Sequence, residues 1–116
     1  MLSLVSAAAA FAADTTKYPL FDDESPTDGR VIWIANCEGC HAYGIAGSPN
    51  PLKPQDWADR ARKDRETLYS HAIEGFFGPE DTMMPPRGGN DALSDTEVKA
   101  AVDYMLSLAL HYQNNK

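Results

Sequence analysis

Five consecutive residues, Cys37-Glu38-Gly39-Cys40-His41, have a spacing that can hold a metal-containing cofactor. Two thiols three positions apart on one turn can reach the two vinyl groups on one side of a haem and form thioether bonds. The histidine directly after the second cysteine is then placed under the iron, which its imidazole nitrogen can bind. The pattern therefore predicts one haem c, covalently bound through Cys37 and Cys40, with His41 as an iron ligand.

Three other kinds of site use paired cysteines, and the rest of the chain fits each of them less well. A thioredoxin-like redox pair follows a strand in a βαβ unit, whereas a helical pattern precedes Cys37. A zinc site needs two further ligands at matching spacing, and the chain has only two cysteines. A structural disulfide between Cys37 and Cys40 suits an exported protein, but it leaves His41 without a role.

An iron with one histidine ligand needs a second axial ligand or keeps an open position. The candidates are His71, His111, Met1, Met83, Met84 and Met105. His71 and His111 suit partly exposed positions, and Met105 suits the apolar face of a C-terminal helix. Met83 and Met84 instead stand before two prolines in an irregular segment, where the prolines can hold a thioether sulfur in place. Spacing alone does not separate these two methionines.

Hydrophobic periodicity predicts that the elements around these residues are helices. Asp28 is suited to cap a short helix that leads directly into the cysteines. Helical patterns return over residues 56–63 and 65–74, and glycines break the second of them. Residues 94–97 form a capping box before an amphipathic run. Residues 78–91 predict no regular structure, because adjacent prolines are followed by adjacent glycines. No strand pattern is present, so we expect an all-α protein.

Length and charge limit the class of protein further. A chain of 116 residues is typical of one domain. Its 17 acidic and 10 basic residues give a formal net charge of −7, which argues against nucleic acid as a partner and favours a partner with a basic docking patch. No apolar run approaches the roughly 20 residues that a membrane-spanning helix needs. An integral membrane protein and a multidomain enzyme are both excluded as interpretations.

The first thirteen residues, MLSLVSAAAAFAA, are uncharged and almost wholly small or apolar. With Ala10-Phe11-Ala12 as a cleavage site of the A-x-A type, they predict a signal peptide or its remnant, and therefore export. No lysine or arginine precedes the apolar stretch, so an ordinary N-terminal helix is the alternative. Residues 14–27 contain an acidic cluster, Asp22-Asp23-Glu24, and two prolines, and we expect an extended arm there.

Residues 28–105 resemble the class I c-type cytochromes, most of all the short bacterial monohaem carriers of the cytochrome c-five type. The resemblance is carried by the haem-binding pentapeptide together with Met84-Pro85-Pro86-Arg87-Gly88-Gly89 and Leu93-Ser94-Asp95-Thr96-Glu97-Val98. It implies an all-α class I cytochrome c fold, with three to five helices wrapped around one covalently bound haem. In the family, the methionine directly before the proline pair binds the iron, which favours Met84 over Met83. The resemblance divides the chain into a signal peptide or remnant (1–13), an acidic N-terminal arm (14–27), a cytochrome c domain (28–112) and a tail (113–116).

Other positions match the family one by one. Pro49 resembles the loop proline whose carbonyl group accepts the second N–H of the iron-binding histidine, which would fix the tautomer of His41. Trp57 and Arg60 resemble a pair that lies beside the haem propionates, where indole and guanidinium groups can donate to carboxylates. Core packing of Trp57 and a solvated charge at Arg60 are the alternatives.

Other positions that match the family concern only the packing of its helices. Gly29 and Trp33 match the glycine and the aromatic residue where the first and last helices of the family cross, and Tyr104 is the expected partner on the last helix. Many relatives carry an additional cysteine pair near that helix, which this chain lacks.

The resemblance implies a one-electron carrier, not an enzyme, that works between periplasmic or membrane-bound redox partners in the bacterial periplasm. We expect a monomer whose contact rim includes Ile45, Ala46 and Pro85. One alternative is a haem-based enzyme or gas sensor with an open or displaceable sixth ligand, for which His71 would be the distal histidine. Another is a dedicated cytochrome subunit of a larger oxidoreductase.

Overall fold

The computed structural model describes residues 17–21, 28–78 and 82–115, so the predicted signal peptide and the Asp22-Asp23-Glu24 cluster lie outside the described residues. The described helices are, in chain order, α2 (Gly29–Asn36), α3 (Glu38–His41), α4 (Pro54–Trp57), α5 (Arg65–Glu74) and α6 (Asp95–Asn114). Three single 3-10 turns accompany them: η2 (Ile45–Gly47), η3 (Arg60–Arg62) and η4 (Pro86–Gly89). The mostly helical architecture confirms the predicted all-α class.

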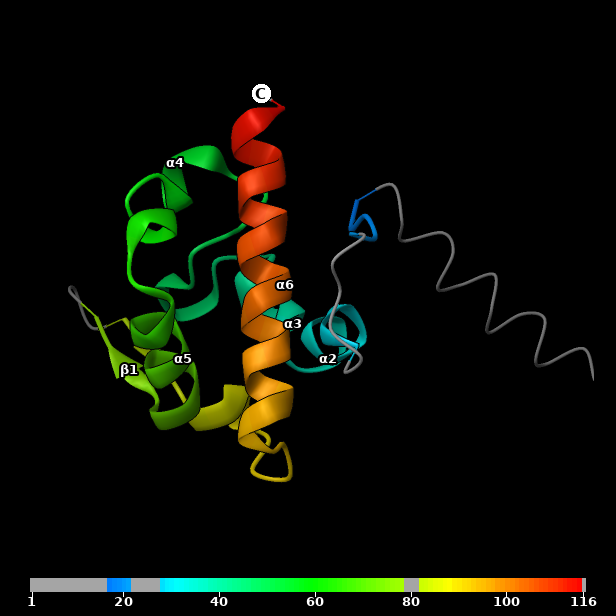
Figure 1. Cartoon of the computed structure of the whole chain (residues 1–116). Coiled ribbons are helices and arrows are strands. Elements are labelled where there is room, and N and C mark those ends of the chain that lie inside the picture. Colours follow the sequence, from blue (N-terminus) through cyan, green and yellow to red (C-terminus); the bar gives the residue numbers. More distant parts are fainter. Residues whose placement is uncertain (1–16, 22–27, 79–81, 116) are drawn as a thin grey trace, which may run out of the picture.

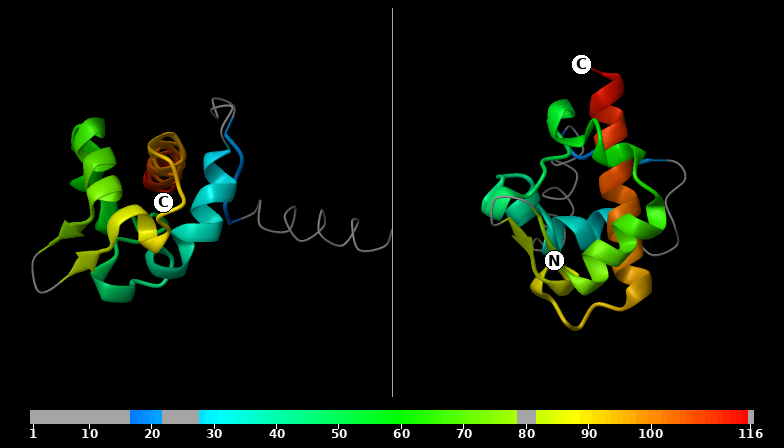
Figure 2. Two further views of the ribbon diagram at one scale, coloured as in Figure 1. Left: turned by 90° about the horizontal axis from the view of Figure 1, so that it is seen from below. Right: turned by 90° about the vertical axis from the view of Figure 1, so that its left-hand side faces the viewer.

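Helix α6 is the element against which the other helices pack. It lies between α2 on one side and α5 with α4 on the other (Figures 1 and 2). The predicted capping box is present at its start, because Ser94 Oγ accepts from the Glu97 N–H at 3.1 Å and Glu97 Oε1 accepts from the Ser94 N–H at 2.9 Å. Its inward face supplies most of the core: Val98, Ala100, Ala101, Val102, Tyr104, Met105, Leu106, Leu108 and Ala109 are buried.

Helices α2 and α6 cross in close contact at Gly29. A Cβ atom at this position would lie 2.1 Å from the carbonyl oxygen of Ala100, so only a glycine lets the two backbones approach this far. One turn further along α2, the fully buried Trp33 packs beside Tyr104, with 6.0 Å between the ring centroids. The predicted crossing of Gly29 and Trp33 with Tyr104 is confirmed.

Residues 17–21, which we call the N-terminal strap, lie against both crossing helices. Tyr18 is 1% exposed, and its carbonyl oxygen accepts a 2.8 Å hydrogen bond from Arg30 Nε. From α6, the hydroxyl of Tyr104 donates to the Pro19 carbonyl at 2.9 Å, and that of Tyr112 donates to the Lys17 carbonyl at 2.8 Å. The strap therefore belongs to the packed core, although its sequence predicted only an extended arm.

The expectation that no strand is present was wrong in one place. Strands β1 (Phe76–Phe77) and β2 (Met83–Met84) pair antiparallel, with Phe76 opposite Met84 and Phe77 opposite Met83. Two residues per strand are too few for an alternating pattern to be visible in the sequence. The segment 78–91 was also expected to lack regular structure, and it contains both β2 and η4. In η4, positive φ angles at Arg87 and Gly88 keep the turn from continuing as a helix.

Candidate functional site

One apolar cavity, partly open to solvent, lies between α6, α5, the β1–β2 hairpin and the segment that runs from Cys37 to Pro49. It encloses about 1020 Å³ of space that protein atoms do not fill, including the part open to solvent. Its apolar wall includes Leu68, Ala72, Val98, Ala101, Val102 and Met105. The apolar character of this wall suits a mostly apolar ligand.

Cys37 lies between α2 and α3 at this cavity, and Cys40 lies within α3. Cys37 is on the cavity wall, and its N–H donates to the Trp33 carbonyl at 2.8 Å, which continues α2 into the turn. Burial, with a smaller contribution from Cys40, raises the pKa of the Cys37 thiol to about 12. Cys40 is exposed, and both residues are free thiols. The two cysteines are therefore three positions apart without a disulfide between them, and Cys37 faces the cavity.

His41 is buried on the cavity wall, directly after this turn. Its Nδ1–H donates a 2.9 Å hydrogen bond to the carbonyl oxygen of Pro49, as the resemblance implied for this pair. Burial lowers the pKa of His41, so the ring favours its neutral form. With the proton on Nδ1, the second nitrogen keeps the lone pair that a metal ligand needs.

The loop that carries Pro49 is fixed by a residue that the sequence did not identify. Asn50 is buried; its side-chain nitrogen donates to the Ala42 carbonyl at 3.2 Å, and its side-chain oxygen accepts from the Leu52 N–H at 2.9 Å. Its own N–H donates to the Asp56 carboxylate at 3.0 Å. An asparagine after a proline is a common turn signal, but nothing in its spacing indicates that it supports the Pro49 carbonyl.

Met83 and Met84 both border the cavity, from β2. Successive side chains of a strand point to opposite faces, and the two methionines differ accordingly. Met83 is 45% exposed. Met84 is half-buried and packs against the cluster of Ala72, Val98 and Val102. The inward position of Met84 favours it as the sulfur ligand, in line with its place directly before the proline pair.

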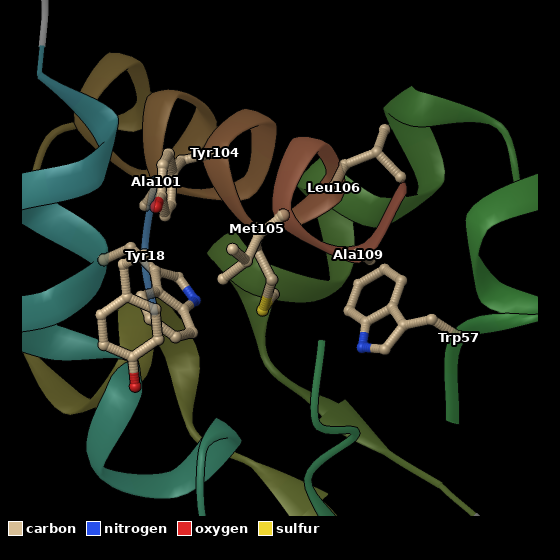
Figure 3. Close-up of a cluster of buried hydrophobic side chains, with 9 residues drawn as sticks. Tyr18, Trp57, Ala101, Tyr104, Met105, Leu106 and Ala109 are labelled. Atoms are coloured by element: carbon tan, nitrogen blue, oxygen red, sulfur yellow. The ribbon is translucent and has the colours of Figure 1, made fainter. Parts of the chain in front are cut away.

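The other ligand candidates occupy different surroundings. Met105 is 8% exposed and belongs to the core, where its side chain and that of Trp57 extend from different elements into the same interior (Figure 3). His111 lies far along α6 and packs edge-on against Phe21 and Tyr112. Met1 lies outside the described residues. Met105 also borders the cavity that Met84 borders, from α6, whereas His111 is not among the residues of its wall.

His71 is closer to the cavity than its sequence position suggested. It was expected to be partly exposed, and it is; it also borders the cavity and stacks on Phe76, with ring centroids 4.0 Å apart. Burial and the nearby Lys63 lower its pKa, while Glu74 acts in the opposite direction. The hairpin that supplies Phe76 was not predicted, which is why this stacking could not be foreseen.

Two buried tryptophans supply unused hydrogen-bond donors. The indole Nε1 atoms of Trp33 and Trp57 are buried and have no hydrogen-bond partner among the described residues, and both side chains border the cavity. Buried donors without acceptors are rare in folded proteins, so they point to a bound group that carries acceptors. Arg60, also on the wall, donates from Nη1 to the Asp56 carbonyl at 2.7 Å.

These residues fit a haem. The cavity is apolar, and Cys37, His41 and Met84 border it, with Cys40 next to His41 in α3. The buried indole N–H groups lack acceptors of the kind that propionates carry. Arg60, Lys63 and Arg87 are the charged side chains with fixed positive charge on the described wall, and they suit anionic groups on the ligand.

Comparison with known proteins points the same way. Residues 24–105 match the family described as cytochrome c oxidase, cbb3-type, subunit III. The chain is 34% identical over 101 residues to cytochrome c-555 of Prosthecochloris aestuarii, a match that covers 84% of this chain and 96% of that protein. It is 38% identical over 78 residues to cytochrome c-555 of Chlorobaculum tepidum, covering 67% and 71% of the two chains. Cytochrome c5 of Ectopseudomonas mendocina is 29% identical over 79 residues, covering 66% and 85%.

Proposed function

The chain belongs to the small monohaem class I c-type cytochromes, and we propose that it carries single electrons between redox proteins with His41 and Met84 as the axial ligands of its haem iron. The haem, attached through Cys37 and Cys40, supplies a centre that takes up and releases one electron. The observation that carries the proposal is the hydrogen bond from His41 to Pro49 on the wall of the same apolar cavity that Met84 borders.

The protein residues act by fixing the ligands and by keeping water away. The Pro49 carbonyl holds the imidazole of His41 in one tautomer and one orientation, and it makes the imidazole a stronger donor. Met84 offers a soft, neutral sulfur, which favours the reduced iron and raises the reduction potential. The apolar wall lowers the local dielectric constant around the ligands. No residue is required to move for a single electron to be exchanged.

Trp57 and Arg60 are proposed to bind the haem propionates. The indole N–H of Trp57 is buried on the cavity wall and lacks an acceptor among the described residues. Arg60 uses one nitrogen for the Asp56 carbonyl, and its guanidinium retains further N–H groups for a carboxylate.

An exposed apolar rim beside the cavity is the proposed contact surface for partners. Ile45, which is 52% exposed, and Ala46 lie on η2, and Pro85 lies between β2 and η4. The sequence missed Phe77, which is 82% exposed on β1 opposite Met83. Small apolar contacts of this kind are typical of brief electron-transfer encounters. A monomer that meets partners with a basic docking patch fits the net charge of −7.

The proposed place of action is the bacterial periplasm, on the strength of the apolar segment 1–13 with its A-x-A site. Among the helices of the described residues, none is long and apolar enough to span a bilayer. The family description names an oxidase subunit, so a dedicated subunit is the second candidate. The near-complete match to a small cytochrome favours the free carrier. Co-purification of the chain with an oxidoreductase would favour the subunit instead.

Absorption spectra of the oxidised and reduced protein test the ligand set. We expect a weak sulfur-to-iron band at the red end of the oxidised spectrum that is lost in Met84→Ala and retained in Met83→Ala. Carbon monoxide added to the reduced wild-type protein should leave the spectrum unchanged. If the band is absent and carbon monoxide binds readily, the sixth position is open, and the enzyme or sensor interpretation replaces the carrier.

A further inference from the structure

We propose that Asn36 and Asn90 form a latch that holds the methionine loop (residues 83–90) against the haem-attachment segment and thereby sets how readily Met84 leaves the iron. The proposal rests on Met84 as the sixth ligand, as argued above. Asn36 and Asn90 are positioning residues in it, because they act through the loop and not on the iron.

The first observation is a direct bond between two side chains far apart in the sequence. The Nδ2–H of Asn90 donates to Oδ1 of Asn36 at 2.8 Å, across a separation of 54 residues. Asn36 is the last residue of α2 and directly precedes Cys37, whereas Asn90 follows the turn after Met84. The bond therefore joins the segment that attaches the haem to the segment that supplies the sulfur.

Both amides are held in the orientation that this bond needs. Asn36 donates from Nδ2 to the Ile32 carbonyl at 2.9 Å, which leaves its oxygen facing the loop. Asn90 accepts at Oδ1 from the Ala92 N–H at 3.1 Å, which leaves its NH2 group facing α2. Because each amide has a second partner, neither must lose much side-chain freedom to form the latch.

The second observation is a close backbone contact at the same place. A Cβ atom on Gly88 would lie 3.1 Å from the backbone oxygen of Asn36, and Gly88 has a φ of +64°. Two turns connect this contact to the methionine: the Gly88 N–H donates to the Pro85 carbonyl at 3.2 Å, and the Asn90 N–H donates to the Arg87 carbonyl at 3.1 Å. The chain from Pro85 to Asn90 is therefore a stiff unit that begins next to Met84.

A second set of bonds, made by Arg87 in the middle of this unit, holds it to the start of α6 and to the segment just before that helix. Arg87 pairs with Asp95 at 2.7 Å and donates from Nη1 to the Leu93 carbonyl at 3.1 Å. These contacts leave the loop attached to α6 when the latch opens, so the loop can swing away from α2 without unfolding the helix. The latch then controls a local opening of the loop.

This opening can be measured with an external ligand that competes with Met84 for the iron. Its apparent affinity rises in proportion to the fraction of molecules whose methionine has left the iron. Loss of one hydrogen bond of ordinary strength should raise that fraction about fivefold.

Two variants that add the same charge separate the loss of the Asn90 N–H donor from the effect of the charge itself. Asn90→Asp removes the N–H that Asn36 accepts but keeps the oxygen that the Ala92 N–H needs, whereas Asn36→Asp keeps the acceptor and adds the same negative charge at the same place. Imidazole is titrated into each oxidised holoprotein, and loss of the red sulfur-to-iron band is followed. We expect Asn90→Asp to bind imidazole about fivefold more tightly than wild type, and Asn36→Asp to bind it no more tightly than wild type.

Two further variants serve as an independent test and as a control. Asn36→Ala removes the acceptor without adding charge and should match Asn90→Asp, so the proposal stays testable if Asn90→Asp does not fold. Gln113→Ala breaks a comparable amide bond, from Nε2 to the Pro54 carbonyl at 2.7 Å, far from the loop, and should leave imidazole affinity unchanged. Wild-type affinity in both Asn90→Asp and Asn36→Ala, with the red band present, overturns the latch alone. A wild-type protein that lacks the band overturns the Met84 ligation, and the latch with it.

Discussion

The hydroxyl of Tyr18 donates a 2.6 Å hydrogen bond to Oε2 of Glu38, a residue inside the haem-binding pentapeptide. The Tyr18 ring also lies edge-on to Trp33, with 5.1 Å between the ring centroids, and Trp33 borders the cavity. The N-terminal strap therefore contacts α3, which carries most of the haem-binding pentapeptide, as well as α2, which leads to it.

Replacing Tyr18 by phenylalanine should lower the free energy of unfolding by about 2 kcal/mol, because a hydrogen bond to a charged acceptor is lost while the ring stays packed. Urea unfolding of the holoprotein measures the change. Tyr112→Phe serves as a matched control: it removes an exposed hydroxyl that donates to the Lys17 carbonyl of the same strap, and its effect should be smaller. Equal effects would mean that the Tyr18–Glu38 hydrogen bond contributes no more to the free energy of unfolding than the bond from Tyr112 to the strap.

Replacing Gly29 by alanine should destabilise the protein by about 3 kcal/mol, because the added methyl group meets the Ala100 carbonyl and forces α2 away from α6. Gly39→Ala is the control, since a Cβ atom at Gly39 would have no atom within 4 Å. Thermal and chemical unfolding of both holoproteins compare them. A Gly29→Ala protein as stable as Gly39→Ala would show that the helices can separate at no cost.

The features that the sequence predicted correctly are those encoded by local spacing. The capping box at Ser94 and Glu97 joins residues three apart, and the haem-binding pentapeptide is contiguous. The contact of His41 with Pro49 and the close crossing of the last helix at Gly29 join residues farther apart in the sequence, and there the family resemblance was needed for the expectation. Both were then found in the structure.

The features that the sequence did not reveal join single polar or aromatic residues across long separations. Tyr18 meets Glu38 across 20 residues, and Asn90 meets Asn36 across 54. Such pairs leave no periodic pattern, because each depends on the completed packing of two elements. The β1–β2 hairpin was missed for the opposite reason, since two-residue strands are too short to show alternation, and the position of His71 on the cavity wall was missed with it.

Replacing Trp57 by phenylalanine should lower the reduction potential by an amount on the order of tens of millivolts. The indole N–H, if it donates to a propionate, offsets part of the negative charge that stabilises the oxidised iron. Phenylalanine keeps the apolar packing and removes only the donor. Spectroelectrochemical titration measures the potential, and Tyr112→Phe, which lies away from the cavity, is the control. A potential equal to that of wild type would leave Trp57 with a packing role alone.

Removing both thiols, as in Cys37→Ser/Cys40→Ser, should leave the chain without covalent haem and largely without the cooperative unfolding transition of the holoprotein. Val98, Val102 and Met105 of α6 border the cavity and would face a void or water. Far-ultraviolet circular dichroism and thermal unfolding follow the helix content. Met84→Ala, which retains the covalent haem, is the comparison. A thiol-free chain that unfolds as cooperatively as Met84→Ala would show that the polypeptide packs without its cofactor.

Reversing the charges of Asp22, Asp23 and Glu24 should slow electron transfer to a basic partner protein at low ionic strength, and the difference should shrink as salt is added. Stopped-flow mixing with a basic redox protein measures the rate. Reversal of three exposed acidic residues elsewhere, Asp59, Asp64 and Glu66, changes the net charge equally. If both triple variants react at the same rate, net charge acts without any special contribution from the arm.

The position of α6 in the chain has a consequence for the order of events during biosynthesis. The close contact at Gly29, two of the hydrogen bonds to the N-terminal strap and one wall of the cavity come from a helix that is translated after every other described element. Until the ribosome has made it, Gly29 of α2 and the carbonyl groups of Lys17 and Pro19 lack their partners on α6. We therefore expect the core to close only late in synthesis, which suits the proposed export of the chain and leaves Cys37 and Cys40 within reach of haem attachment.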